Sequence, residues 1–364
     1  MNATVPKAPR FGVEEEFLLL DAETGIPRDG SDEIIAALPE LRAEHEFFHS
    51  QLETATPVCD AAEDAEGSLV EFRSSAARAA EDLGLVLAGA GLPPLGGEIP
   101  GRIVEKPRYL EIDRTMRGMV SRYYSTGTHV HVEVPSRDAG IEAISRIAPW
   151  TPVLIALTAN SPVWLGDETG YACWRYLSLQ QWPSSGYPPA FADAAEYDRV
   201  VDGLVSAGAL LDRALVNWSI RLSERFPTIE IRTADAQLRS EDAVAYAMLY
   251  RALVARALRE AAAGAPFVPA QPDLLRGASW LAARNGLGSE LVDPRTGERE
   301  PAFAVIEALV EHVGDELAAA GDLDRVRAYV AGRRADGGPA NRQLLTWREG
   351  GIAGLLELYR SASG

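Results

Sequence analysis

A stretch of strictly alternating residues, 127–135 (Gly-Thr-His-Val-His-Val-Glu-Val-Pro), is the part of the sequence that most constrains the fold. Successive side chains of a β-strand point to opposite sides, so this stretch predicts a strand with valines on one face and His129, His131 and Glu133 on the other. The valine face is typical of a protein core. Two imidazoles and a carboxylate beside a core indicate a functional site; the alternative is an ordinary half-buried strand with solvated polar residues.

Two more segments repeat this design: residues 11–21 (Phe-Gly-Val-Glu-Glu-Glu-Phe-Leu-Leu-Leu-Asp) and residues 226–233 (Phe-Pro-Thr-Ile-Glu-Ile-Arg-Thr). A third candidate strand, residues 44–54, is less clean, because Glu53 would share a face with aromatic and imidazole side chains. Together these strands predict one shared polar face, which carries Glu14, Glu16, Glu53, His129, His131, Glu133, Glu230 and Arg232.

Apolar residues recur at helical spacing in residues 61–91, 136–160 and 194–216, which predicts helices there. Beyond Ser240, which is expected to cap a helix, nearly the whole chain has helical character. Strands therefore dominate the first part of the sequence and helices the last. This order predicts an α+β fold, with helices packed on one face of a mainly antiparallel sheet.

We expect one domain over residues 1–364, whose C-terminal part, about 240–364, is helical. Residues 164–191 are rich in Gly, Pro, Trp and Tyr and have no clear periodicity. Such a long segment inside a compact domain is usually functional or disordered, and its aromatic content favours order. The segment is therefore predicted to form a loop or lid on the substrate side.

Three successive acids, Glu14 to Glu16, repel one another inside an apolar run, and a bound divalent cation would compensate them. An exposed acidic edge is the alternative. The predicted polar face offers mostly oxygen ligands with one or two imidazoles, which suits Mg²⁺ or Mn²⁺ better than Zn²⁺. Carboxylates beside arginines are typical of phosphoryl transfer, in which metal ions bridge nucleotide phosphates.

Composition excludes some functions. The net charge of −18 argues against a nucleic-acid partner, which would require a basic face. No apolar run is long enough to span a membrane, and the first ten residues lack the apolar segment of a secretory signal. Cys59 and Cys173 are the two cysteines, and Cys173 is expected to be a buried structural thiol rather than a nucleophile. A cytoplasmic location fits these features.

Four motifs together resemble the type 2 glutamate–cysteine ligase family, which includes the carboxylate–amine ligases of the YbdK type. They are Gly12-Val-Glu-Glu-Glu-Phe; Gly127-Thr-His-Val-His-Val; Ala159-Asn-Ser-Pro-Val-Trp followed by Thr169-Gly-Tyr-Ala-Cys-Trp-Arg; and Arg225-Phe-Pro-Thr-Ile-Glu-Ile-Arg. The motifs occur in the order found in the family. The resemblance implies a glutamine-synthetase-like catalytic sheet, ATP and two or three Mg²⁺ ions, with small-molecule acid and amine substrates. A homodimer is expected from the resemblance and from base rates.

The resemblance also implies roles for single residues. The metal ligands would be Glu14, Glu16, Glu53, His129 and Glu230, of which Glu53 rests on the weakest motif. The catalytic arginines would be Arg232, facing the transferred phosphoryl group, and Arg175, holding a carboxylate or phosphate. The substrate-binding residues would be His131, Glu133, Arg221 and Tyr171. Many relatives have a small residue in place of Glu133, so that carboxylate is expected to influence which amine is accepted.

The predicted function is ATP-dependent formation of an amide through an acyl phosphate, with glutamate and cysteine giving γ-glutamylcysteine. The same reaction with another acid or amine, including ammonia, is the nearest alternative. His-x-His-x-Glu on a strand would also suit a metal-dependent hydrolase that needs no nucleotide. A descendant that binds a nucleotide or a small acid without catalysis is the remaining alternative.

Overall fold

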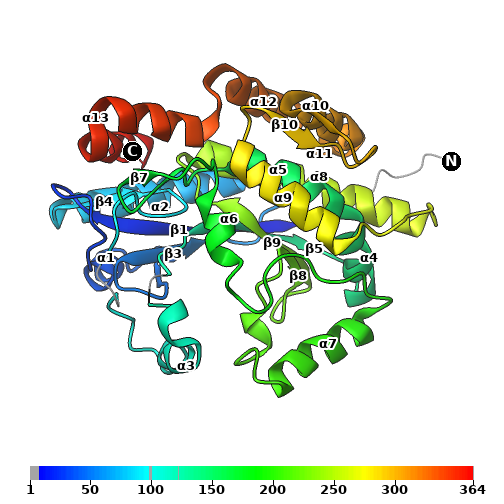
Figure 1. Ribbon diagram of the computed structural model, residues 1–364, viewed down its shortest axis with the longest axis horizontal. Helices are drawn as coiled ribbons and strands as arrows, with labels where there is room; N and C mark the ends of the chain where they lie inside the picture. Colours follow the sequence, from blue (N-terminus) through cyan, green and yellow to red (C-terminus); the bar gives the residue numbers. More distant parts are fainter. Residues whose placement is uncertain (1–7, 98–100, 122, 364) are drawn as a thin grey trace.

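The computed structural model describes residues 8–97, 101–121 and 123–363, and a seven-stranded antiparallel sheet runs through the middle of the protein (Figure 1). The strand order is β2-β3-β1-β5-β9-β8, and β4 pairs with β1. The strands are β1 (Phe11–Asp21), β2 (Glu44–His45), β3 (Gln51–Ala55), β4 (Leu85–Ala88), β5 (Gly127–Glu133), β8 (Ile220–Leu222) and β9 (Thr228–Asp235). This confirms the predicted α+β class and the three alternating strands.

The strand register brings the predicted site residues together. Glu14 of β1 lies opposite His129 of β5, and His131 of β5 lies opposite Glu230 of β9. On the other side of β1, Glu16 lies opposite Glu53. Directly opposed residues of antiparallel strands have Cβ atoms about 4.5–5.5 Å apart. Side chains separated by 37 to 115 positions in the sequence therefore become neighbours on one face.

Most helices cover the opposite face of the sheet. In Figure 1, α5, α8, α9 and the C-terminal helices lie above the strands, whereas α3 and α7 lie below them. The helices are α1 (Ser31–Ala37), α2 (Ala62–Asp82), α3 (Pro107–Met116), α4 (Arg137–Ile147), α5 (Thr151–Thr158), α6 (Trp174–Leu179), α7 (Ala194–Ser206), α8 (Ser240–Ala262), α9 (Pro272–Asn285), α10 (Ala302–His312), α11 (Gly314–Ala320), α12 (Leu323–Asp336) and α13 (Gly338–Ser363). The main helical layer therefore lies on the face opposite the polar side chains, whereas α3 and α7 lie on the other side of the sheet.

The central acid of the Glu14–Glu16 run lies on the helix-covered face. Glu15 is 1% exposed and pairs with Arg73 of α2, which is 2% exposed, through contacts of 2.5 and 2.9 Å. Arg73 also donates to the backbone carbonyls of Gln237 (3.0 Å) and Leu238 (2.8 Å). A buried arginine, rather than a divalent cation, therefore compensates this one of the three successive acids.

Several predicted element boundaries were wrong. Residues 61–91 contain α2 followed by strand β4, and the single strand expected over 44–54 is the β2–β3 pair. The helix expected over 136–160 is interrupted by a 3₁₀ turn at Ala148–Trp150, which contains Pro149, and Pro152 follows at the start of α5.

Further corrections concern later segments. Residues 164–191 are less irregular than expected, because they include strand β7 (Asp167–Glu168), paired with β6 (Val163–Trp164), and helix α6. Another short strand pair, β10 (Glu290–Val292) and β11 (Arg299–Pro301), interrupts the C-terminal helices. Ser240 is the first residue of α8 rather than its cap, since Arg239 occupies the N-cap position.

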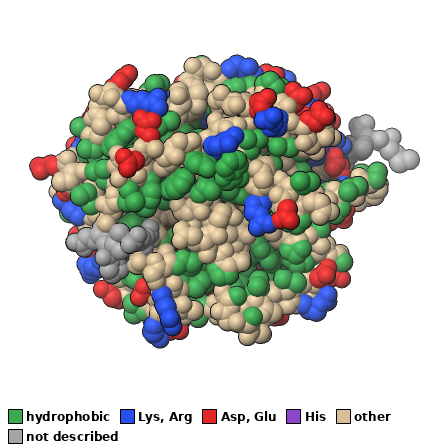
Figure 2. Space-filling view, in the orientation of Figure 1, with side chains coloured by type: hydrophobic (Ala, Val, Ile, Leu, Met, Phe, Trp, Pro, Cys, Tyr) green, Lys and Arg blue, Asp and Glu red, His purple; other side chains and the backbone are tan. Residues whose placement is uncertain are grey.

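Figure 2 shows acidic and basic side chains interspersed over one face of the molecule, with apolar side chains between them. None of the helices in the described part of the chain combines the length and apolar composition needed to cross a lipid bilayer.

Candidate active site

Three ligand-type side chains from three strands converge on the polar face of the sheet. One ligand atom each from Glu14 of β1, His131 of β5 and Glu230 of β9 lies within 4.8 Å of the other two. His131 Nε2 is 3.2 Å from Glu14 Oε1 and 3.8 Å from Glu230 Oε2. The opposite ring nitrogen, Nδ1, is hydrogen-bonded to Thr228 Oγ1 at 3.0 Å. The sequence prediction gave His131 a substrate-binding role, which stays a prediction; the structure places its Nε2 within this group.

His129 and Glu16 extend the cluster toward β3. His129 Nδ1 is 3.7 Å from both Glu14 Oε2 and Glu16 Oε1. Glu16 Oε2 accepts a hydrogen bond of 2.7 Å from the backbone N–H of Gly127, which fixes the carboxylate at the start of β5. Five side chains therefore form one continuous group across three strands: Glu14, Glu16, His129, His131 and Glu230.

Two arginines flank Glu230. Arg221 of β8 contacts both carboxylate oxygens, at 2.7 and 3.2 Å, and Arg232 of β9 contacts Oε1. Burial raises the pKa of Glu230, but Arg221 and then Arg232 outweigh this effect and hold the pKa well below its usual range. Arg221, predicted to bind substrate, lies in the structure as a partner that orients Glu230.

Opposite charges also set the ionisation of the other cluster residues. Burial raises the pKa of Glu14, but the imidazoles of His129 and His131 outweigh it, so the net shift is downward. The pKa of His131 is raised, because Glu14 and Glu230 overcome the effect of burial. The pKa of His129 is lowered by burial and by Arg232. Ionised carboxylates and a neutral His129 suit a metal ion, whereas a metal ion at His131 would have to displace the proton that its raised pKa favours.

The cluster fits a divalent cation by its donor set and by its unpaired atoms. The buried atoms His129 Nε2 and His131 Nε2 have no hydrogen-bond partner in the described part of the protein. A buried polar atom without a partner is unfavourable and calls for an explanation, which a bound cation supplies for His131 Nε2. The carboxylate-rich set suits Mg²⁺ or Mn²⁺.

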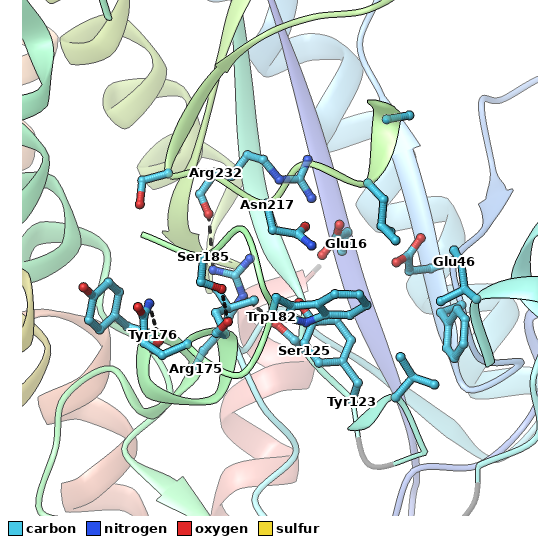
Figure 3. A pocket seen from close by; sticks show the side chains of 18 of the residues that line it. Glu16, Glu46, Tyr123, Ser125, Arg175, Tyr176, Trp182, Ser185, Asn217 and Arg232 are labelled. Carbon is cyan, nitrogen blue, oxygen red and sulfur yellow. Dashed lines mark hydrogen bonds between the residues drawn. The ribbon is translucent and has the colours of Figure 1, made fainter. Parts of the chain in front are cut away.

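A pocket adjoins the cluster through Glu16 and Arg232 (Figure 3). It encloses about 1180 Å³, part of it open to solvent. In Figure 3 the carboxylates of Glu16 and Glu46 lie near each other, while Asn217 and Trp182 form other walls. The further lining residues include Arg108, Tyr109, Tyr123, Ser125, Arg175 and Thr233.

Glu46 and Glu53 add acid to this side of the cluster. Glu46 lines the pocket but was not among the predicted site residues, because the strand expected over 44–54 would place it on the face opposite Glu53; in the structure it lies between β2 and β3. Burial and then the charge of Glu16 raise the pKa of Glu46 to about 8. Burial and then Glu46 also raise the pKa of Glu53. Glu53 is thus close to the predicted cluster but lies outside the three-residue ligand group.

The other predicted residues have different surroundings. Arg175 is 3% exposed and lines the pocket, and it donates to Ser125 Oγ (2.8 Å) and to the carbonyl of Ala234 (3.1 Å). Glu133 lies at the outer end of β5, where Arg10 holds its carboxylate at 2.8 and 3.0 Å. The carboxylate of Glu133, which the sequence prediction linked to the choice of amine, is therefore paired with Arg10.

Tyr171 lies apart from the cluster. Its ring packs against Trp174 and Trp280, with centroid distances of 5.2 and 6.1 Å, and it lines a neighbouring cavity. That cavity shares Tyr123 and Ser125 with the pocket described above. The structure therefore does not bring Tyr171 to the carboxylate–imidazole group.

A second cavity meets the cluster from the other side. Glu14 and His131 line it, and so do the apolar side chains of Val58 and Phe226 and the basic side chain of Arg42. The ligand group thus separates a polar cavity, reached through Glu16 and Arg232, from a more apolar one, reached through Glu14 and His131. This arrangement allows two different molecules to meet at the cluster.

Solved structures share this fold. The chain matches a glutamate–cysteine ligase from Francisella tularensis, crystallised in complex with AMP, with a TM-score of 0.69 and 13% identity; the match covers 98% of this chain and 88% of the other. A bifunctional glutathione synthetase from Pasteurella multocida also gives a TM-score of 0.69, with 14% identity, over 98% of this chain and 52% of the other. At these identities the likeness concerns the fold.

Sequence comparisons define the family. The family model described as glutamate–cysteine ligase family 2 matches residues 10–358. A Frankia alni protein provisionally named glutamate–cysteine ligase 2-2 is 41% identical over 368 residues, with 95% of each chain covered. The chain belongs to glutamate–cysteine ligase family 2. It is therefore an ATP-dependent ligase of the glutamate–cysteine ligase type, as the sequence motifs predicted.

Proposed function

We propose that this enzyme phosphorylates the γ-carboxylate of glutamate with ATP and joins the resulting acyl phosphate to the amino group of cysteine. The carrying observation is the group formed by Glu14, His131 and Glu230, which lies between two cavities and beside Arg232. Family membership supports the reaction type, and the names of the relatives support glutamate and cysteine as substrates.

The more apolar cavity suits the nucleotide. Phe226 and Val58 provide a surface for a base, while Arg42 provides positive charge for phosphates or ribose hydroxyls. A nucleotide in this cavity would direct its phosphates toward Glu14 and His131, which line its inner end. The phosphoryl group would then pass the ligand group to the polar cavity lined by Glu16 and Arg232.

The polar cavity suits the acid and the amine. Arg108, Arg175 and Arg232 supply positive charge for carboxylates, and Glu46, whose pKa is raised to about 8, supplies a carboxyl group that an ammonium group beside it would favour in its ionised form. An amino acid carries both kinds of group. The pocket thus offers complementary partners for glutamate and for an amino-acid acceptor. A site that binds only an anion would not need the acidic group.

Glu14, His131 and Glu230 would hold one divalent cation, and Glu16, Glu53 and His129 would hold others beside it. Such ions, when bound, offset the repulsion between the substrate carboxylate and the phosphates of ATP. In the reaction, a γ-carboxylate oxygen forms a bond to the γ-phosphorus as the bond to ADP breaks. The amine nitrogen then attacks the acyl carbon, phosphate leaves, and the nitrogen loses a proton. Arg232 lies where it can stabilise negative charge on the transferred group.

Release of ADP tests the proposal. Purified enzyme is incubated with ATP and Mg²⁺ and with acids and amines, alone and in pairs. We expect ADP to form fastest with glutamate plus cysteine and γ-glutamylcysteine to accumulate in equal amount. Glu16→Gln should abolish turnover, whereas Glu241→Gln, which removes an exposed carboxylate at the start of α8, should leave it unchanged.

The same screen separates the alternatives. Faster ADP release with a different acid or amine would overturn the choice of substrates but retain the ligase. Turnover of an amide or ester without a nucleotide would favour a metal-dependent hydrolase. Absence of any ADP release with all pairs, in a protein that still binds ATP, would overturn the proposed reaction.

A further inference from the structure

A second group of ligand-type side chains lies outside the candidate active site. Asp32 in the first turn of α1, His45 of β2 and His49 before β3 each place one ligand atom within 4.8 Å of the other two. Asp32 Oδ1 is 3.2 Å from His45 Nε2, and Asp32 Oδ2 is 3.1 Å from His49 Nδ1. None of these residues belongs to the proposed catalytic cluster.

The hydrogen bonding of the His49 imidazole leaves its Nδ1 available as a metal ligand. Its Nε2 is 2.9 Å from Glu105 Oε2, and because a carboxylate only accepts, Nε2 carries the hydrogen. The ring is 3% exposed, and its Nδ1 is buried without a hydrogen-bond partner among the described residues. In the neutral ring, a lone pair of Nδ1 therefore faces the carboxylate of Asp32. Two electron-rich atoms 3.1 Å apart repel each other unless a proton or a metal cation lies between them.

His45 has the matching arrangement. Its Nδ1 is hydrogen-bonded to Ser31 Oγ at 3.1 Å, while Nε2 faces Asp32. Metal-binding histidines usually donate their second ring nitrogen to a carboxylate, hydroxyl or carbonyl, which fixes the ring and its tautomer. Glu105 and Ser31 have the positions of such outer partners for His49 and His45.

The backbone holds the group in place. The carbonyl of His49 accepts hydrogen bonds from the N–H groups of Gly30 and Ser31, both at 3.1 Å, and its N–H donates to the carbonyl of Arg102 at 3.0 Å. These bonds tie the start of α1 and the segment before α3 to the turn that carries His49. A preorganised site requires little rearrangement on binding.

We propose that Asp32, His45 and His49 bind a zinc-class divalent cation, with Glu105 as the outer partner of His49. Two imidazoles and a carboxylate are ligands that suit Zn²⁺, and atoms bound at about 2.0–2.2 Å in a tetrahedral site lie roughly 3.3–3.6 Å apart. The separations of 3.1 and 3.2 Å are close to this spacing. Asp32, which is 53% exposed, leaves an open side for entry of the ion and for a water ligand.

A cation bound at this site would stabilise the segments that form the walls of the active-site pocket. Glu46 and Phe47, which line the pocket, lie between the two histidines in the chain, and Arg108 and Tyr109 follow Glu105 in α3. A cation joining α1, the β2–β3 segment and the outer partner before α3 would hold these pocket walls together. It is thus a structural site, separate from the ions proposed for catalysis.

Zinc binding by the chelator-treated, full-length protein tests the proposal. Zinc equivalents and affinity are measured by calorimetry, and Co²⁺ replaces Zn²⁺ for visible absorption spectra. We expect Asp32→Asn to lose one equivalent and the corresponding Co²⁺ bands. Glu105→Ala should weaken this equivalent by about 10–100-fold, the usual effect of removing an outer partner. The protein melting temperature should rise with zinc in the wild type but rise less in Asp32→Asn.

Two controls identify the site. Glu33→Gln removes an exposed carboxylate from the same turn of α1 and should keep the equivalent. Glu14→Gln should keep it as well, because Glu14 belongs to the catalytic cluster. Unchanged zinc stoichiometry and affinity in Asp32→Asn, or the same loss in Glu33→Gln, would overturn the proposal. These readouts do not depend on ligase activity, so they stand apart from the proposed function.

Discussion

Arg221 and Arg232 both contact the carboxylate of Glu230, but their other surroundings differ, which suggests a different role for each arginine. Arg232 lines the polar pocket and contacts Glu230 Oε1. Arg221 contacts both oxygens of Glu230, and its Nη1 donates to the backbone carbonyls of Ala214 (2.8 Å) and Val216 (2.6 Å). Under the proposed function, Arg221 would orient a metal ligand, whereas Arg232 would face the reacting groups.

The two substitutions should change different kinetic parameters. Arg232→Gln removes a positive charge beside the transferred phosphoryl group, and the loss should be about 2.7–4 kcal/mol of transition-state stabilisation, or about 10²–10³-fold in kcat. Glu230 keeps Arg221 in this variant, so its position is retained. Arg221→Gln leaves the pocket charge intact but releases Glu230, and it should weaken binding of the catalytic cation by about 10–100-fold.

A titration of Mg²⁺ at saturating ATP and substrates, followed by ADP release, distinguishes the two effects. The Arg221→Gln curve should shift to higher Mg²⁺ and approach the wild-type plateau. The Arg232→Gln curve should keep its midpoint and reach a plateau lower by about 10²–10³-fold. Recovery of Arg232→Gln at high Mg²⁺, or an equally low plateau for Arg221→Gln, would refute this division of roles.

Other features give predictions that need no substrate. Arg73→Met leaves Glu15 as a buried, unpaired charge and should lower the free energy of unfolding in urea by about 3–5 kcal/mol; adding Glu15→Leu should restore most of it, and an equally unstable double variant would contradict the pairing. Hydrogen bonds from Thr24 hold the pKa of Asp21 at about 2, below its ordinary 3.8, so this group stabilises the fold above pH 3.8 and the gain is lost as the pH falls toward 2. The melting temperatures of the wild type and Asp21→Asn should therefore converge over that range. Burial raises the pKa of both free cysteines, so a thiol reagent should modify them only after unfolding; rapid labelling of the native protein would contradict this.

Local patterns were sufficient to predict the three strands that carry the site. Residues 11–21 form β1 over their full length, because alternation there continues into a fully apolar run. The same reasoning missed β4, whose four residues, Leu85–Ala88, follow a long helix and are all apolar. A short apolar run has no periodicity that distinguishes a strand from a helix, so only its pairing with β1 decides its structure.

The site was predictable in its members but not in their pairings. Alternation placed Glu14, His131 and Glu230 on polar faces, and the antiparallel register then brought them together. Alternation also placed Glu15 on the core face, but its partner Arg73 is 58 positions away and follows only from how α2 packs. Alternation over the expected strand 44–54 placed Glu46 on the face opposite Glu53, but the strand breaks between β2 and β3, so this period does not apply to Glu46.

The ionisation of the acids on the polar face determines how many protons a bound cation must displace. Glu230 has two arginine partners, but Glu46 and Glu53 have raised pKa values, because of burial and because each lies near other acids. With a pKa of about 8, Glu46 carries a proton at pH 7 in the metal-free protein, so the folded state loses stability as the pH rises from 4.5 toward 8. A cation bound beside Glu16 favours the charged carboxylates and should release protons.

Calorimetry of Mg²⁺ binding in two buffers of different ionisation enthalpy measures that release. At pH 7 the apparent binding enthalpy should differ between the buffers in proportion to the protons released. Glu46→Gln cannot release this proton, so its difference should be smaller, and its metal-free form should lose less stability between pH 4.5 and 8 than the wild type. Equal enthalpies in both buffers would show that the acids are already ionised. The arginines and imidazoles alone would then balance the face, and the charge argument for catalytic cations would fail.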